Sequence, residues 1–311
     1  MRDIEYIVGV EVGGGHISVA LVSSSGTLIP DTLKYFRIDS NGSKEDILTK
    51  WALPIKSVLN KVDRSKVQGI SFAMPGAFDY KQGIALFSGN GKYNSLYNVN
   101  ISQALHDKLN LSASLPMRYI NDATAFAMGV CWKGEARNHQ RVMCFTLGTG
   151  IGSAFMEDGM PVVCGDDVPE HGCLWHLPFR DGIVDDYFST RWFIQESELK
   201  YGVSIRGVKS LAATARKHSH AMEIFSKFGQ NLGEMLAPWL ERFRPQCLCF
   251  GGNISQSSDL FKSTLVETLA NLGHSPQIVF SSQTEEMALY GSTRLYDPEV
   301  WDRIYEELPT L

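Results

Sequence analysis

The same short pattern occurs in both halves of this chain: an apolar strand, a tight glycine turn, a second apolar strand and a second turn. It runs as "IVGVEVGGGHISVALVSSSG" from residue 7 and as "VMCFTLGTGIGSAFMEDG" from residue 142. Further strand and helix patterns follow each copy, which is typical of a duplicated α/β unit. The repeat therefore predicts two lobes that face each other across a cleft, with both glycine turns pointing into it.

Chain length and composition agree with two soluble lobes. At 311 residues the chain exceeds the size at which a single hydrophobic core stops growing. Its 44% hydrophobic residues, 20% charged residues and net charge of -5 are typical of a globular protein and disfavour a nucleic-acid partner. The sequence shows neither a secretory signal nor an apolar run of membrane-spanning length. We expect a cytoplasmic protein with no membrane and no nucleic-acid partner.

The six cysteines are scattered along the chain without a C-x-x-C pair. This spacing disfavours the commonest structural zinc sites. Cys247 and Cys249 alternate along an expected strand, so both side chains face the same side of it. We expect buried free thiols.

Apolar periodicity predicts the main elements of both lobes. Pro54 is expected to bend the helix near 43–62. Pro245 is expected to end the helix near 221–243, whose aromatic stripe is typical of a core face. The expected strands lie near 5–12, 16–23, 67–74, 117–121, 141–148, 151–156, 247–251 and 277–281, and the expected helices lie near 43–62, 100–110, 122–132 and 221–243.

The spacing of Gly148, Gly150 and Gly152 is typical of a dinucleotide-binding turn, but that fingerprint needs a helix after it, and here a strand follows. The segment "GNGKYNS" fails as a P-loop because Tyr93 stands where Ser or Thr would bind magnesium. A tight Gly/Thr hairpin exposes backbone N–H groups that can bind an anion, and Thr149 offers a hydroxyl. Either turn alone is explained equally well as an ordinary hairpin. The pair favours a polyphosphate held between the lobes.

The segments "GVEVGGGHISVAL", "GISFAMPGAFD", "YINDATAFAMGV", "CFTLGTGIGSAF" and "LCFGGNIS" occur in an order that resembles the ROK family of bacterial sugar kinases. The resemblance covers nearly the whole chain. It implies a two-lobed, actin-like ATPase (ribonuclease H-like) fold of duplicated mixed β-sheet units with flanking helices. It also implies a sugar in the cleft, ATP as co-substrate and Mg²⁺. The division that it implies is an N-terminal lobe of 1–121 joined by a C-terminal helix at about 297–311, and a C-terminal lobe of 122–296.

The resemblance assigns the catalytic base to Asp122, which stands where a strand gives way to a helix. A helix N-cap is the alternative role, and the two roles are compatible. A carboxylate there can accept the proton of an attacking sugar hydroxyl, and an unperturbed Asp is already ionised at neutral pH. Asn121 and Asn90 match sugar contacts, although a loop Asn such as Asn90 is as often a turn former.

The resemblance also assigns the nucleotide contacts. The turns of both lobes would clamp the phosphates, and the segment "CFGGNIS", which could otherwise be a simple β-to-α turn, would face the adenosine. The residues concerned are Gly13, Gly14, Gly15, Gly148, Thr149, Gly150 and Gly152 for the phosphates, and Gly251, Gly252 and Asn253 for the adenosine.

The first phosphate motif departs from the family pattern Asp-x-Gly-Gly-Thr-Lys. Glu11 replaces the Asp and keeps the charge that a Mg²⁺ shell requires, with contact through a water molecule expected. Gly15 and His16 replace the Thr and the Lys, which removes a hydroxyl donor and a nearby cation. We expect slower transfer or a different nucleotide preference.

The sugar-binding segment departs as well. His176 keeps its place in the family pattern Glu-x-Gly-His, but Cys173 replaces the Glu, and Glu170 is the expected substitute. The family's cysteine-rich zinc loop is absent, so we predict no zinc, and Asp185 at the position of its terminal Glu could still contact the sugar. His176 is equally well explained as a hydrogen-bonded structural residue, and the adjacent Trp175 as a core residue.

Three functions follow from this pattern, and an ATP-dependent kinase acting on a hexose or N-acetylhexosamine hydroxyl is favoured. The first alternative is a catalytically weakened or inactive sugar-binding regulator without a DNA-binding domain, since the first phosphate strand begins within about five residues of the start. The second is an actin-like phosphotransferase with a non-sugar acceptor. A homodimer is expected from the resemblance.

Overall fold

The computed structural model describes residues 4–89, 91–215 and 217–309, and the chain divides into two compact units. Unit 1 comprises Met1–Gly129 and Glu285–Leu311, and unit 2 comprises Val130–Thr284. The chain therefore passes between the units after residues 129 and 284, whereas the sequence analysis divides it after residues 121 and 296. Asp122, assigned there to the C-terminal lobe, lies in unit 1 together with the first glycine turn.

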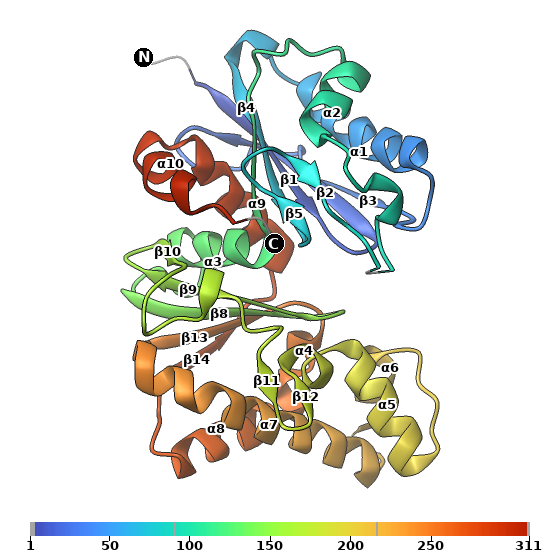
Figure 1. Ribbon diagram of the computed structural model, residues 1–311, viewed down its shortest axis with the longest axis vertical. Helices are drawn as coiled ribbons and strands as arrows, with labels where there is room; N and C mark the ends of the chain where they lie inside the picture. The colour runs from blue at the N-terminus through green and yellow to red at the C-terminus, as the bar shows by residue number, and fades with distance from the viewer. Residues whose placement is uncertain (1–3, 90, 216, 310–311) are drawn as a thin grey trace. The chain divides into compact units, whose positions relative to one another are not determined.

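Unit 1 contains a five-stranded mixed sheet in the order β3-β2-β1-β4-β7 (Figure 1). The β1–β2 and β2–β3 pairs are antiparallel, and the β1–β4 and β4–β7 pairs are parallel. The strands are β1 (Tyr6–Val12), β2 (His16–Ser23), β3 (Lys34–Arg37), β4 (Val67–Met74) and β7 (Met117–Asn121), and a small hairpin adds β5 (Phe78–Asp79) and β6 (Ile84–Ala85).

Unit 2 repeats this arrangement strand for strand, with the order β10-β9-β8-β13-β14. Again the first two pairs are antiparallel and the last two are parallel. The duplication predicted from the two glycine turns is therefore confirmed in strand order and direction. The strands are β8 (Arg141–Leu147), β9 (Ile151–Glu157), β10 (Met160–Val162), β13 (Cys247–Gly251) and β14 (Gln277–Phe280), and a hairpin adds β11 (Pro178–Phe179) and β12 (Gly182–Ile183).

Two helices pack side by side on one face of the unit 1 sheet (Figure 1). α1 (Lys44–Leu59) begins at Ser43, whose hydroxyl accepts from the Asp46 amide at 3.2 Å, and it buries an apolar face that includes Trp51. α2 (Ile101–Leu109) begins at Asn100, which caps it in the same way. Both expected helices are confirmed, and Pro54 lies inside α1.

α3 (Asp122–Trp132) and α9 (Thr284–Thr293), the helices in which the chain leaves and re-enters unit 1, cross at very close range. A Cβ at Gly129 would collide with the Met287 carbonyl, and one at Gly291 with the Ala125 carbonyl. Only glycine permits this approach. The crossing explains why the first turns of α3 belong to unit 1, beyond the boundary that the sequence analysis places at residue 121.

The remaining helices lie mainly in unit 2. The aromatic stripe of the long α7 is buried in its core, as expected, and the helix ends at Phe243, after which Arg244 adopts a left-handed conformation. The C-terminal helix is shorter than the expected 297–311. The bounds are α4 (Val184–Tyr187), α5 (Thr190–Tyr201), α6 (Val208–Ala215), α7 (Ser219–Phe243), α8 (Lys262–Asn271) and α10 (Pro298–Ile304), followed by a 3-10 turn at Tyr305–Glu307.

All six cysteines are free thiols. Cys247 and Cys249 are buried together on β13 as expected, and Cys131 is partly buried, but Cys164 is exposed. The expectation of burial is therefore wrong for that residue, which lies in the connection after β10. In the described part of the chain no helix combines the length and the apolar character needed to span a membrane.

Candidate active site

Asn121 and Asp122 stand at the carboxyl end of β7, where α3 begins. The Asn121 side-chain oxygen accepts from the amides of Ala123 (3.0 Å) and Thr124 (3.2 Å), and its amide group donates to the Tyr80 hydroxyl at 3.3 Å. Asn121 therefore caps the helix, the role that the sequence offers as an alternative for Asp122. This leaves Asp122 in the first turn, where its carboxylate accepts from the Ala123 amide at 2.8 Å.

The environment of Asp122 shifts its acidity. Burial, together with the nearby negative charge of Glu11, raises the pKa of Asp122 to about 6, against the opposing effects of backbone amides and of Lys92. The role of a base requires no such shift, because an unperturbed Asp is already ionised at neutral pH. The shift arises because the side chain is enclosed in unit 1 beside a second carboxylate. A carboxylate with a pKa of about 6 is ionised at neutral pH and is a better proton acceptor than a free Asp.

The first glycine turn lies between β1 and β2. It closes with a hydrogen bond from the Gly13 amide to the His16 carbonyl at 3.0 Å, and the buried Tyr93 donates its hydroxyl to the Gly13 carbonyl at 2.6 Å. Within the described ranges the amides of Gly14 and Gly15 have no hydrogen-bond acceptor. Two adjacent amides without acceptors form a site for an anion.

Beside this turn, His16 lies between two carboxylates. Its Nε2 is 3.1 Å from Glu11 Oε2 and 3.2 Å from Glu285 Oε1. Burial alone would lower the pKa of His16, but the hydrogen bonds to both glutamates outweigh it and raise the pKa to about 10. Tyr35 stacks on the imidazole with ring centroids 5.1 Å apart. Burial raises the pKa of Glu11, whereas the hydrogen bond to His16 lowers the pKa of Glu285. The Glu285 carboxylate therefore balances the imidazolium by itself, and His16 has no surplus positive charge to offer a phosphate.

Within the described residues, one group of side chains could hold a metal ion: Glu11, His16 and Glu285, whose ligand atoms lie within 4.8 Å of one another. Mg²⁺ prefers oxygen ligands and retains water molecules, so the two carboxylates suit it through bridging waters, whereas an imidazole does not. The residues present therefore fit a Mg²⁺ ion held through water by Glu11.

The second glycine turn, between β8 and β9 of unit 2, has the same property. The Gly148 amide donates to the Gly150 carbonyl at 3.0 Å, and the Gly148 carbonyl accepts from Thr190. In the described part of the chain the amides of Thr149 and Gly150 lack an acceptor. Gly152 lies within β9, opposite Thr146. The adjacent amides available to an anion in this turn are therefore those of residues 149 and 150.

Asp185 supports this turn. Its Oδ1 accepts from the Ile151 amide at 2.9 Å, and its Oδ2 accepts from Arg191 at 2.9 Å. A Cβ at Gly150 would lie 2.5 Å from Asp185 Oδ1, so glycine at 150 permits the carboxylate to approach. Asp185 was expected to contact the sugar, but both of its oxygens are bonded within unit 2.

The motif assigned to adenosine lies at the end of β13, before the 3-10 helix Ile254–Leu260. Gly252 has φ +89°, its amide donates to Thr284 Oγ1 at 2.8 Å, and a Cβ there would collide with the Leu147 backbone. Gly251 is the last residue of the strand, and Asn253 leads into the 3-10 helix. Gly252 therefore lets the chain turn closely over the end of β8.

Two other residues assigned to the sugar in unit 2 lie on one segment: Glu170 begins the 3-10 turn Glu170–Gly172, and His176 follows that turn. Glu170 and His176 are exposed, whereas Cys173 is buried and donates its thiol to the His171 carbonyl at 3.5 Å. The core role weighed for Trp175 is wrong, since that side chain is 48% exposed. Asn90 lies outside the described residues.

Sequence reasoning missed three neighbours of the candidate site. Glu285 pairs with His16 across most of the chain length, and Tyr93 and Lys92 contact the first turn from the loop after β6. The departure from Lys at position 16 could have prompted a search for another cation, but nothing in the local pattern pointed to Lys92.

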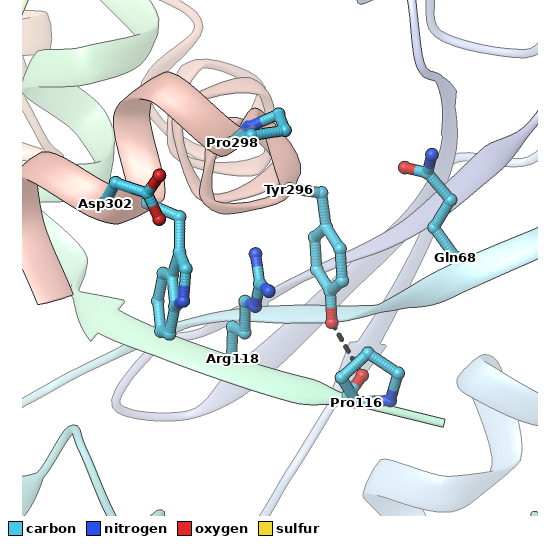
Figure 2. A pocket seen from close by; sticks show the side chains of 7 residues that line it. Gln68, Pro116, Arg118, Tyr296, Pro298 and Asp302 are labelled. Carbon is cyan, nitrogen blue, oxygen red and sulfur yellow. Dashed lines mark hydrogen bonds between the residues drawn. The ribbon is translucent and has the colours of Figure 1, made fainter. Parts of the chain in front are cut away.

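A pocket of about 390 Å³ lies elsewhere in unit 1 (Figure 2). In it Arg118 packs over the rings of Tyr296 and Trp301, at 4.8 and 4.1 Å, and the Tyr296 hydroxyl donates to the Pro116 carbonyl at 2.6 Å. Pro116 precedes β7, whereas Asp122 follows it. The pocket is therefore at the opposite end of the strand from the candidate site.

Comparison with known proteins identifies the family of this chain. The chain matches the ROK family over residues 7–297. It belongs to the ROK family. Its relatives include a glucokinase from Thermotoga maritima, 27% identical over 85% of this chain and 87% of that protein. The xylose repressor of Bacillus subtilis is 28% identical over 96% of this chain and 79% of the repressor, so ROK relatives include a protein that is named as a regulator.

The fold agrees with this membership. A crystal structure of a ROK glucokinase from Streptomyces griseus, in complex with glucose and AMPPNP, superposes with a TM-score of 0.73 at 19% identity, covering 93% of this chain and 98% of that one. The predicted actin-like ATPase fold is therefore confirmed.

Proposed function

We propose that this ROK protein is an ATP-dependent kinase that phosphorylates a hydroxyl group of a hexose or an N-acetylhexosamine. The observation that carries the proposal is the arrangement in unit 1. There Asp122, with its pKa raised to about 6, lies within electrostatic range of Glu11 on the strand that leads into the first glycine turn, whose two amides lack acceptors. A proton acceptor and an anion site in one unit are two requirements of phosphoryl transfer.

In the proposed reaction the sugar oxygen forms a bond to the γ-phosphorus while the bond from that phosphorus to the β–γ bridging oxygen breaks. The bridging oxygen leaves with ADP, and the proton of the sugar hydroxyl passes to Asp122. Asn90 and Asn121 would orient the sugar, with Glu170 and His176 contributing from unit 2. Because both Asp185 oxygens are already bonded, we assign Asp185 to holding the second glycine turn in shape.

The phosphates would accept hydrogen bonds from the amides of Gly14 and Gly15 in the first turn and of Thr149 and Gly150 in the second. Mg²⁺, when bound, neutralises charge on the β- and γ-phosphates, and Glu11 would hold it through water. Gly251, Gly252 and Asn253 would pass beside the adenosine. These contacts follow the family resemblance, and the unpartnered amides support them.

The test is ADP release from Mg-ATP across hexoses, N-acetylhexosamines and ketohexoses, with wild type, Asp122→Asn and a control, Asp107→Asn. Asp107 is exposed on α2, so its variant should match the wild type. We expect turnover on one sugar class and a loss of about 10²–10⁴-fold in Asp122→Asn. Equal turnover in wild type and Asp122→Asn would overturn the assignment of the base.

The positive charge of His16 is balanced by the neighbouring glutamates, which supports one alternative: a sugar-binding regulator with little or no catalysis. If no acceptor raises ADP release above the water background while a sugar still binds in calorimetry, this alternative replaces the kinase. A homodimer and a cytoplasmic location remain predictions.

A further inference from the structure

The loop after β6 places one more charged group at the first glycine turn. Tyr93 is buried at 1% exposure, and its φ of +56° turns the chain back toward β1. Its amide donates to the Ser40 carbonyl at 2.7 Å, and its hydroxyl donates to the Gly13 carbonyl at 2.6 Å. Edge contact with Trp51, at a centroid distance of 5.5 Å, completes the enclosure. The backbone of the preceding residue, Lys92, is therefore fixed relative to the turn.

The Lys92 side chain lies against the turn itself. A Cβ built at Gly14 would collide with the Lys92 ammonium group and would lie 3.0 Å from Cε and 3.3 Å from Cδ. The Lys92 charge also acts on the Asp122 carboxylate. One ammonium group thus lies beside Gly14, whose amide has no acceptor among the described residues, and within electrostatic range of the proposed base.

The charge balance of the turn gives this lysine a role. In the family pattern a Lys follows the turn, and in this chain His16 stands there with its charge balanced by Glu11 and Glu285. Mg²⁺ aside, no cation considered so far faces the terminal phosphate, which would approach three acidic side chains, Asp122, Glu11 and Glu285. Opposing charge placed where negative charge accumulates in the transition state is among the largest catalytic effects.

We propose that Lys92 contacts the terminal phosphate of the nucleotide at the Gly14 amide and neutralises its charge during transfer, a proposal that rests on the kinase function proposed above. As the γ-phosphorus moves from the bridging oxygen to the sugar oxygen, the ammonium group stays bonded to a non-bridging phosphate oxygen. Lys92 exchanges no proton in this step. Lys92 thereby supplies, from a different loop, the positive charge that the family pattern places at residue 16.

The experiment compares wild type with Lys92→Met, Lys92→Arg and a control, Lys50→Met, whose side chain is exposed on α1. Two measurements are made on each protein: Mg-ATP affinity by calorimetry, and kcat and KM on the best acceptor. We expect Lys92→Met to bind Mg-ATP at least about tenfold more weakly and to lose about 10²-fold in kcat. Lys92→Arg should recover much of both, and Lys50→Met should match the wild type.

The pH profile separates a direct role from a structural one. Since Lys92 lowers the pKa of Asp122, its removal should move the acid limb of kcat/KM to higher pH, and Lys92→Arg should restore it. Circular dichroism and melting temperature verify that each variant is folded. If Lys92→Met does not fold, the arginine variant still tests the proposal.

The outcomes distinguish this proposal from the proposed function. An inactive wild type that still binds Mg-ATP, with binding weakened in Lys92→Met, would refute the kinase and support Lys92 as the phosphate contact. An active wild type with unchanged affinity, kcat and pH profile in Lys92→Met would support the kinase and overturn the role of Lys92.

Discussion

His16 on β2 and Glu285 at the start of α9 are joined by a 3.2 Å contact between Nε2 and Oε1. The same nitrogen contacts Glu11 on β1 at 3.1 Å, and Ser18 donates its hydroxyl to Glu285 at 3.1 Å. The segment in which the chain re-enters unit 1 is thus attached to β2, and His16 connects it in turn to Glu11 on β1.

We expect His16→Ala to destabilise the protein at neutral pH by about 2–4 kcal/mol, because it leaves the buried Glu11 carboxylate without its partner. Urea denaturation would measure the loss, with the exposed His218→Ala as a control. A midpoint for His16→Ala that equals the control would mean that the pair contributes nothing to stability.

The pKa of Asp122 predicts the pH dependence of the reaction. A base must be unprotonated to accept the sugar proton, so kcat/KM should fall as the pH drops below about 6 and level off above it. A pH series with one acceptor measures this limb. An acid limb near pH 4, typical of a free carboxylate, would contradict the enclosed environment of Asp122.

Asp122 should also reduce stability. Its pKa is higher in the folded protein than in the unfolded chain. Below about pH 3.8 the carboxyl is protonated in both states and costs no stability, but as the pH rises through about 6 the folded protein loses stability because the buried group must ionise. At pH 8 we expect the free energy of unfolding of Asp122→Asn to exceed that of wild type by about 1–3 kcal/mol, which thermal unfolding would show as a higher melting temperature. The difference should disappear at pH 4. A variant less stable than wild type at pH 8 would count against this account.

Two glycines of the second turn should respond differently to substitution. Gly150→Ala would force Asp185 away and should destabilise unit 2 by about 1–3 kcal/mol, whereas a Cβ at Gly148 meets nothing within 4 Å. Thermal unfolding of Gly150→Ala and Gly148→Ala makes the comparison within one turn. Equal losses in both variants would show that Asp185 does not depend on the glycine at 150.

Most strands and the repeat could be predicted because their apolar alternation is local. The glycine turns marked where β1 meets β2 and where β8 meets β9, and the structure confirms both pairs. Among the described residues, five helices were not predicted: α5, α8 and α9 because their apolar residues form no strong stripe, and α4 and α6 because they are short. The boundary between the units was misplaced because it depends on the approach of Gly129 to α9, a contact between distant segments.

The candidate site was predictable only in part. Asp122 and the turns follow from local motifs, and the family resemblance names them. The Glu285 contact and the position of Lys92 depend on tertiary packing, and the pKa of Asp122 depends on burial. The role of Asn121 as the helix cap required the hydrogen bonds themselves.

The measurement that tests the account most directly is transfer of the labelled γ-phosphate of ATP to a sugar, with the product identified by phosphorus NMR, for wild type and Asp122→Asn. We predict one sugar phosphate from the wild type and almost none from the variant. Inorganic phosphate as the sole product across all acceptors, or an equal yield of sugar phosphate from both proteins, would contradict the central claim that Asp122 activates a sugar hydroxyl.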